Sequence, residues 1–313
     1  MALTSPLPRL TPPFASSHQL HDPSTRRLPG HPSVPLDDRQ KVRDCLEGEL
    51  WAEDMERVAH RLWWMSKQDS ANISPLHRQL VKRRAVVVSE DPKLHLVWIH
   101  DRIFVKPLPR YLGSHGFWQD HLCDGSERTA RLRGAALGLL RTYRYLVRHE
   151  SDFRIAQDPS LCLIPGDVTW EQFSDFVSDL AGITDRDVSA RYAYGEIRLT
   201  RLNFYAPFLL GRSHFQRVEY QYGTFFARFY GPILFVIGIT SLVLSGLQVT
   251  VAVEHDGVLS SAALWFSVAV ILIFCAIFSS LALLLVYKVA AEWRFAIRDR
   301  QRLSEERKIG LAG

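Results

Sequence analysis

The sequence predicts a mainly α-helical protein with a small antiparallel β element, in which a cytosolic domain precedes a two-helix transmembrane hairpin. Apolar residues recur every three or four positions over long stretches of the N-terminal two thirds, as they do on one face of a helix. Two long segments nearer the C-terminus contain no charged residue. Short runs rich in Val and Ile account for the β element.

Residues 1–37 are predicted to form a disordered tail. This segment holds eight of the sixteen prolines, together with many serines and threonines. So few apolar side chains gain too little from burial to offset the entropy that ordering removes. The segment also lacks the apolar stretch of a secretory signal peptide, so we expect no cleaved signal.

Residues 38–205 are predicted to form a mostly helical cytosolic domain. Its first helix begins near Gln40, where apolar residues start to recur at helical spacing. Segments rich in β-branched residues follow at 85–88 and 94–100, with a third directly afterwards. We therefore expect a small antiparallel hairpin or sheet near residues 85–107.

The strongest helical pattern covers residues 126–150. One stripe of this helix is apolar, and several arginines share a neighbouring flank. Another helix is expected to start at Thr169, because Thr169 and Gln172 have the spacing of a capping box. The arginines on the flank of the first helix are Arg133, Arg141, Arg144 and Arg148.

Residues 191–207 interleave three arginines with three tyrosines. A residue that precedes proline avoids helical backbone angles, so we predict a helix that ends before Pro207. Arg198 and Arg201 lie three residues apart and can reach the same partner. A juxtamembrane helix rich in aromatic residues and arginines is expected over residues 206–229.

Residues 230–253 and 261–287 are predicted to be transmembrane helices 1 and 2. Each segment is free of charge and longer than the roughly 20 residues that cross a hydrocarbon core of about 30 Å. The connecting loop, residues 254–260, has no Lys or Arg, whereas both outer flanks are rich in them. The positive-inside rule then places both termini in the cytosol, the loop in the lumen or outside, and a basic cytosolic tail at 288–313.

These features together predict a multi-pass membrane protein with two spans. A net charge of +5 favours anionic partners such as lipid head groups. The four cysteines are widely spaced without a Cys-x-x-Cys pair, which indicates a reducing environment for most of the chain. No other targeting signal occurs, and the endoplasmic reticulum is the default expectation for the membrane.

Catalytic motifs are scarce. His115 and Asp120 form the one pair that we nominate as a general base and its orienting carboxylate, by analogy with membrane acyltransferases. A His-x4-Asp string arises readily by chance, and a glycine-rich acyl-phosphate motif is missing downstream. No Gly-x-Ser-x-Gly elbow or glycine-rich nucleotide motif occurs either. We therefore assign no catalytic residue and keep His115 with Asp120 as the alternative.

The binding candidates are cationic. The histidines near Cys123 lack the paired spacing of zinc ligands, so we expect no metal and no cofactor. Interleaved aromatic and basic residues also bind single-stranded nucleic acid, but a position beside the membrane explains this composition better, and we expect no nucleic-acid partner. The candidates for contact with anionic lipid or a protein partner are the four flank arginines together with Arg198 and Arg201.

Small residues spaced four apart occur in both predicted spans, as Ser241 with Ser245 and as Ala276 with Ser280. Such pairs let helices approach closely, which fits either packing of the hairpin on itself or a homo-oligomer. No charged residue or histidine lies inside either span, and this disfavours an ion-coupled or proton-coupled transporter.

Several segments are distinctive enough to carry a resemblance: IHDRIFVKPLPRYL (99–112), ESDFRIAQD (150–158), TWEQFSDFVSDL (169–180), YGEIRLTRLNFYAP (194–207), QYGTFFARFYGP (221–232) and EWRFAIRDR (292–300). They resemble an uncharacterised family of filamentous-fungal membrane proteins, over roughly residues 40–300. The resemblance implies a cytosolic helical domain with two C-terminal transmembrane helices, and no catalytic or binding residues. Some relatives carry a subtilisin-like label, but the motif contexts of that protease class are missing here.

Three functions agree with these features to different degrees. We favour a non-enzymatic anchor or scaffold whose cytosolic domain binds a protein partner or an anionic lipid surface. The alternative is a membrane-bound enzyme that modifies lipids or acyl groups near the head-group plane. A small oligomeric channel comes third, because the predicted spans are so apolar.

Overall fold

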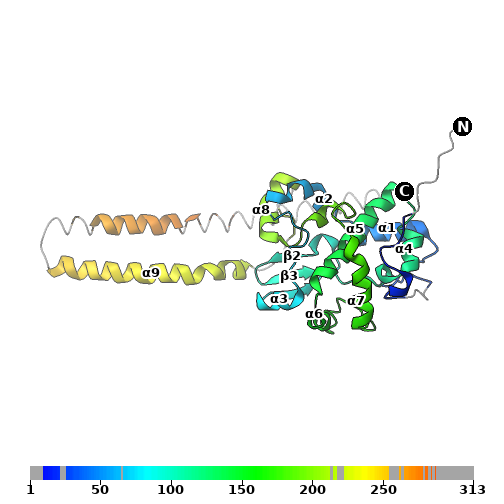
Figure 1. Ribbon diagram of the computed structural model, residues 1–313. Helices are drawn as coiled ribbons and strands as arrows, with labels where there is room; N and C mark the ends of the chain where they lie inside the picture. Colours follow the sequence, from blue (N-terminus) through cyan, green and yellow to red (C-terminus); the bar gives the residue numbers. More distant parts are fainter. Residues whose placement is uncertain are drawn as a thin grey trace. The chain divides into compact units, whose positions relative to one another are not determined.

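The computed structural model describes residues 10–21, 26–64, 66–211, 214–216, 222–253, 261, 264–277, 279–280, 283 and 286. The chain divides into two compact units, residues 1–216 and residues 217–313. Helices dominate the described residues of both units, and the first unit also holds a small sheet (Figure 1). The prediction of a mainly α-helical protein with a small β element is therefore confirmed.

The sheet is mixed, not antiparallel. Its strands run in the order β1-β3-β2-β4. Only β2 and β3 pair antiparallel, whereas β1 pairs with β3 and β2 pairs with β4 in parallel. Between β1 and β2 the chain makes a short 3-10 helix, capped by the Asp91 carboxylate, so β1 becomes a neighbour of β3 instead of pairing with β2. The strands are β1 (Ala85–Val88), β2 (Val97–Ile99), β3 (Arg102–Val105) and β4 (Ile197–Arg198).

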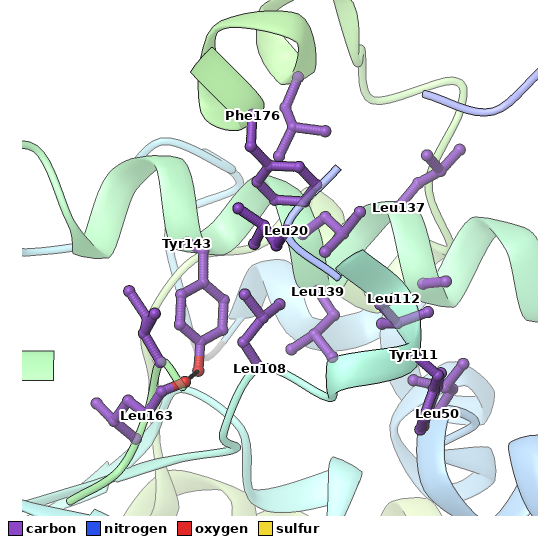
Figure 2. Packing of buried hydrophobic residues seen from close by; sticks show 14 of the residues in the cluster. Leu20, Leu50, Leu108, Tyr111, Leu112, Leu137, Leu139, Tyr143, Leu163 and Phe176 are labelled. Atoms are coloured by element: carbon purple, nitrogen blue, oxygen red, sulfur yellow. Dashed lines mark hydrogen bonds between the residues drawn. The ribbon is translucent and has the colours of Figure 1, made fainter. Parts of the chain in front are cut away.

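Helix α5 (Glu127–Leu146) lies at the centre of the first unit (Figure 1). It starts where Ser126 caps the main-chain N–H of Thr129. Its middle turns are buried on nearly every side, which is the mark of a core helix. Tyr143 points from α5 into the core, where its hydroxyl donates to the carbonyl of Leu163 (3.1 Å; Figure 2) and to that of Lys106 (2.7 Å).

Shorter helices surround α5 in the first unit. The capping box predicted at Thr169 is confirmed, because Thr169 and Gln172 each bond the other residue's main chain at the start of α7. The remaining helices of this unit are α1 (Arg39–Leu50), α2 (Glu53–Val58), α3 (Leu76–Val81), α4 (His115–His121), α6 (Glu150–Ala156), α7 (Trp170–Asp179) and α8 (Leu199–Leu210). The 3-10 helices are η1 (Ser16–His18), η2 (Ala59–Trp64), η3 (Pro92–Leu94), η4 (Arg110–Gly113), η5 (Leu180–Gly182) and η6 (Ala190–Ala193).

The prediction of a disordered tail is wrong for residues 10–21 and 26–37, which are an ordered part of the first unit. Phe14, Leu20 and Leu28 are all buried in the core. The ring of Phe14 meets that of Phe176 on α7 at a centroid distance of 4.8 Å. Composition misled the prediction because a few well-placed apolar side chains suffice when the rest of the core already offers them a pocket.

Helix α8 continues through Pro207, where we predicted that it would end, and stops at Leu210. Pro207 lies on the exposed side of the helix, while Leu199, Leu202 and Ala206 are buried on the other. Packing of that buried side holds the last turn in place although proline removes one main-chain hydrogen bond. The helix ends at Gly211, whose φ of 65° suits glycine.

Helix α9 (Tyr222–Val253) begins the described part of the second unit. It joins the end of the predicted juxtamembrane helix to all of the first predicted span in one helix. Residues 264–277 are also helical. Among the residues that the structure describes, no helix combines the length and apolar character of a membrane span. The predicted loop at 254–260 and tail at 288–313 lie outside the described residues.

Candidate functional site

One surface of α8 carries two large exposed aromatic side chains. Phe204 is 68% and Phe208 is 79% exposed, one helical turn apart. Arg201 is exposed on the same helix, and Arg198 is exposed on β4 directly before it. We call these four residues the α8 surface. Exposed phenylalanines beside arginines are typical of a contact with a membrane interface or with a partner protein.

Arg198 lies against a network that fixes the start of α8. Its guanidinium is 5.2 Å from the ring centroid of Trp98, and the guanidinium of Arg84 lies 4.0 Å from the same ring. Arg84 donates to the Glu196 carboxylate at 2.8 Å. Desolvation raises the pKa of Glu196, but hydrogen bonds from Ser74, Gln79 and Arg84 outweigh it and lower the pKa overall. These contacts fix the main chain at the start of the α8 surface.

The chain that follows α8 is held by the side chain of Asn203. Its amide oxygen accepts hydrogen bonds from the main-chain N–H groups of Phe215 (2.9 Å) and Gln216 (3.1 Å). Its amide nitrogen donates to the Gln216 carbonyl at 3.0 Å. Phe215 is buried. The chain thus folds back onto α8 just before residue 217, where the second unit begins.

Two of the four flank arginines serve the fold. Arg141 is buried, donates to the Tyr192 carbonyl at 2.7 Å and pairs with Asp185 at 2.8 Å. Arg133 donates to the Thr11 carbonyl at 2.7 Å and lies 5.5 Å from the Trp118 ring centroid. Arg141 therefore does not face lipid or a partner, because the segment around residues 185–192 covers its side of α5. Arg133 holds the N-terminal segment.

The other two, Arg144 and Arg148, line a groove of about 620 Å³ between α5 and α7. Arg148 is exposed and lies 5.8 Å from the Tyr145 ring centroid. Arg144 makes one long contact of 3.5 Å with the Ala181 carbonyl. Across the groove, α7 contributes Trp170 and other residues. The spacing of the arginines in the sequence indicated this side of the groove, but no sequence pattern indicated that α7 would form the other side.

Asp152 fixes the main chain at the Arg148 end of this groove. Its side chain is fully buried, and its two oxygens accept hydrogen bonds from the main-chain N–H groups of His77 (2.7 Å), Arg148 (3.1 Å) and His149 (3.1 Å). The His77 ring adds a contact of 2.8 Å. Desolvation raises the pKa of Asp152, but these hydrogen bonds prevail and lower it. The carboxylate therefore ties α3 to the junction of α5 and α6.

Replacement of this carboxylate should have an effect that depends on pH. We expect Asp152→Asn to lower the free energy of unfolding at pH 7 by about 1–3 kcal/mol, because an amide satisfies fewer of these donors. Since the folded pKa is below the unfolded value of about 3.9, the stabilisation is present above that pH and is lost as pH falls through the folded pKa. Urea unfolding of both proteins at several pH values checks this. The exposed Asp37→Asn serves as control, and an equal deficit at pH 7 and below pH 3 would contradict the assignment.

The nominated acid–base pair is not brought together. His115 opens α4, where its ring lies 6.2 Å from that of Phe14. Asp120 is exposed five residues later, about 140° around the helix. No hydrogen bond or ion pair joins the two in the described part of the chain. Within those residues, no group of three or more His, Cys, Asp or Glu could hold a metal ion.

The small residues of the second unit lie on its helices. Ser241 and Ser245 are exposed on α9, and Ala276 and Ser280 are exposed on the following helical residues. The Ser280 hydroxyl donates to the Ile277 carbonyl at 2.8 Å. Their proposed part in helix packing or in a homo-oligomer stays a prediction.

Comparison with known proteins assigns the chain to a family. Residues 42–274 match the model of a family of unknown function, DUF6601. The chain belongs to this family. The DUF6601 match spans both units, from α1 to the helical residues after α9. The expected membership in a family without assigned function is confirmed, while the fungal and membrane character stays a prediction. Neither the curated proteins nor the solved structures gave a match.

Proposed function

We propose that the chain is a non-enzymatic membrane anchor or scaffold. Residues 230–253 and 261–287 enter a lipid bilayer as a hairpin, and the first unit binds a protein partner or an anionic lipid surface on the cytosolic side. Parts of the second segment lie outside the described residues, so the proposal rests on the sequence of both segments and on the exposure of the described side chains.

The observation that carries this proposal is the apolar surface of the second unit. On α9, large apolar side chains such as Leu234, Phe235 and Leu242 are 66–75% exposed. Along residues 264–277, Trp265 and Leu272 are 72% and 64% exposed. Burial of each such side chain is worth about 1.5–3 kcal/mol, so a surface of this extent is unfavourable in water by tens of kcal/mol. A lipid environment removes that cost.

The α8 surface fits a place at the membrane interface. Phe204 and Phe208 are apolar and exposed, and Arg198 and Arg201 add positive charge. Aromatic residues favour the interface, and each arginine near an anionic leaflet contributes about 1 kcal/mol. The Asn203 side chain holds residues 215–216 on α8, so this helix lies beside the point where the chain leaves the first unit. An orientation with both termini cytosolic follows from the basic flanks.

Extraction of membranes at alkaline pH tests the proposal. The full-length chain, expressed in cells, is expected to stay in the membrane pellet after carbonate treatment. The matched control is a chain that ends at Gln216, which lacks the second unit and should be released into the supernatant. Release of the full-length chain under conditions that retain a known integral protein would overturn the membrane anchor.

The orientation has an internal reporter. Asn72-Ile73-Ser74 is a glycosylation sequon, and Asn72 is exposed. A first unit that faces the cytosol meets no glycosylation enzymes, so endoglycosidase should leave the mobility of the protein unchanged. A shift in mobility that the Asn72→Gln variant lacks would place the unit in the lumen instead.

A further inference from the structure

We propose that the groove between α5 and α7 binds a small amphiphile, in which a phosphate or carboxylate is attached to a single apolar chain. The residues that carry the argument are Arg144, Arg148, Trp170, Phe173, Ser174 and Val177. This ligand site goes beyond the proposed membrane anchor, because it lies in the first unit and does not require a bilayer.

One side of the groove, formed by the end of α5 and the residues just after it, supplies positive charge. Arg144 lies in the last turn of α5 and Arg148 lies two residues after the helix ends, and both side chains line the same groove, where one anion can contact both. Neither forms an ion pair with a carboxylate of the described residues. Arg141 and Arg154, by contrast, pair with Asp185 and Glu150 at 2.8 and 2.7 Å. Guanidinium groups bind phosphate and carboxylate oxygens with strong, charge-assisted hydrogen bonds.

The α7 side of the groove is apolar, and we call it the apolar floor. Trp170 and Phe173 stack with a centroid distance of 6.4 Å, and both contact the ring of Phe153. Val177 extends this floor, which runs for about 10 Å along the helix from Trp170. Ser174, between Phe173 and Val177 in the sequence, lines the same groove. An apolar chain placed on this floor can keep its charged end at the arginines.

The walls are held in place before any ligand binds. The main chain of Arg148 is fixed by Asp152, and Phe173 is buried in the core of the unit. A volume of about 620 Å³ lies within the range of about 300–1,000 Å³ that is usual for small-ligand sites. Size and charge together therefore favour a small anionic amphiphile over a folded protein partner.

Titration with hexyl phosphate tests the site, because this compound carries the required head and chain and stays monomeric in water. With the full-length protein in phosphatidylcholine nanodiscs, we expect saturable binding by calorimetry after subtraction of empty nanodiscs. Arg144→Gln and Arg148→Gln should each weaken binding by about tenfold, the loss expected for one hydrogen bond to a charged group. The matched control is Arg154→Gln, which removes the same charge at an exposed position outside the groove and should bind as the wild type does.

Two further probes separate the parts of the ligand. Inorganic phosphate and hexanol, which are the head and the chain alone, should each bind at least tenfold more weakly than hexyl phosphate. The proposal is overturned if hexyl phosphate does not saturate, if both groove variants bind like Arg154→Gln, or if inorganic phosphate binds as tightly. Tighter binding of a short glutamate-rich peptide that contains phenylalanine would likewise assign the groove to a polypeptide. Thermal unfolding of each variant confirms that the fold is intact.

Discussion

Arg191→Met is expected to lower the free energy of unfolding by about 3–5 kcal/mol, the loss that follows when one partner of a buried charged network is removed. The Arg191 side chain is buried, and its guanidinium donates to the carbonyls of Tyr194 (2.9 Å), Gly195 (3.3 Å) and His95 (2.9 Å). Burial lowers the pKa of Arg191 to about 10, and the group therefore remains charged at neutral pH. Methionine fills much of the same space but leaves these carbonyls without a donor.

Urea unfolding of the purified full-length chain, followed by circular dichroism, measures this loss. The matched control is Arg154→Met, which removes an exposed arginine with an ion pair to Glu150 and should cost less than about 1 kcal/mol. Arg191→Lys gives a second comparison, because lysine keeps the charge but cannot reach three carbonyls in one plane. If Arg191→Met unfolded at the same urea concentration as Arg154→Met, the buried network would not be a main source of stability.

The contrast between Arg191 and the predicted binding arginines shows what local pattern can and cannot reveal. Helical spacing located α5 and α7, and the capping residues Ser126 and Thr169 act within one turn of their own helices. Such signals depend only on neighbours in the sequence and therefore survive in the folded protein. Arg141 was a candidate for lipid contact because the helical pattern shows on which flank of the helix it lies. The pattern does not show that Asp185 pairs with Arg141 on that flank.

The parts of the fold that the sequence did not predict depend on distant segments. Strand β4 has two residues and becomes a strand only because β2 lies beside it, about a hundred residues earlier in the chain. Phe14 is ordered by Phe176 on α7. The groove follows the same rule, since its arginines and its apolar floor come from helices separated in the sequence. The sequence indicated one cationic wall and could not show which helix would face it.

Gly138→Ala is the second substitution with a large expected effect, because α5 and η6 meet at this glycine. A methyl group at position 138 would overlap the ring of Tyr192, which is itself buried. The overlap involves ring atoms close to the main chain of Tyr192, so rotation of a flexible end cannot relieve it. Overpacking of this kind costs about 1–3 kcal/mol and sometimes more, and here it exceeds the gain of up to about 1 kcal/mol that alanine brings to a helix.

The sign of the change in the free energy of unfolding distinguishes the effect of this contact from that of helix propensity. Gly48 lies in α1 with open space around it, so Gly48→Ala should raise the free energy of unfolding by up to about 1 kcal/mol, whereas Gly138→Ala should lower it. Tyr192→Leu in the Gly138→Ala background should recover part of the loss, because a smaller side chain makes room for the methyl group. The double-mutant cycle isolates the contact between positions 138 and 192. A Gly138→Ala protein as stable as Gly48→Ala would show that α5 and η6 are not in close contact. The packing that holds Arg191 of η6 beside its carbonyl partners would then also be wrong.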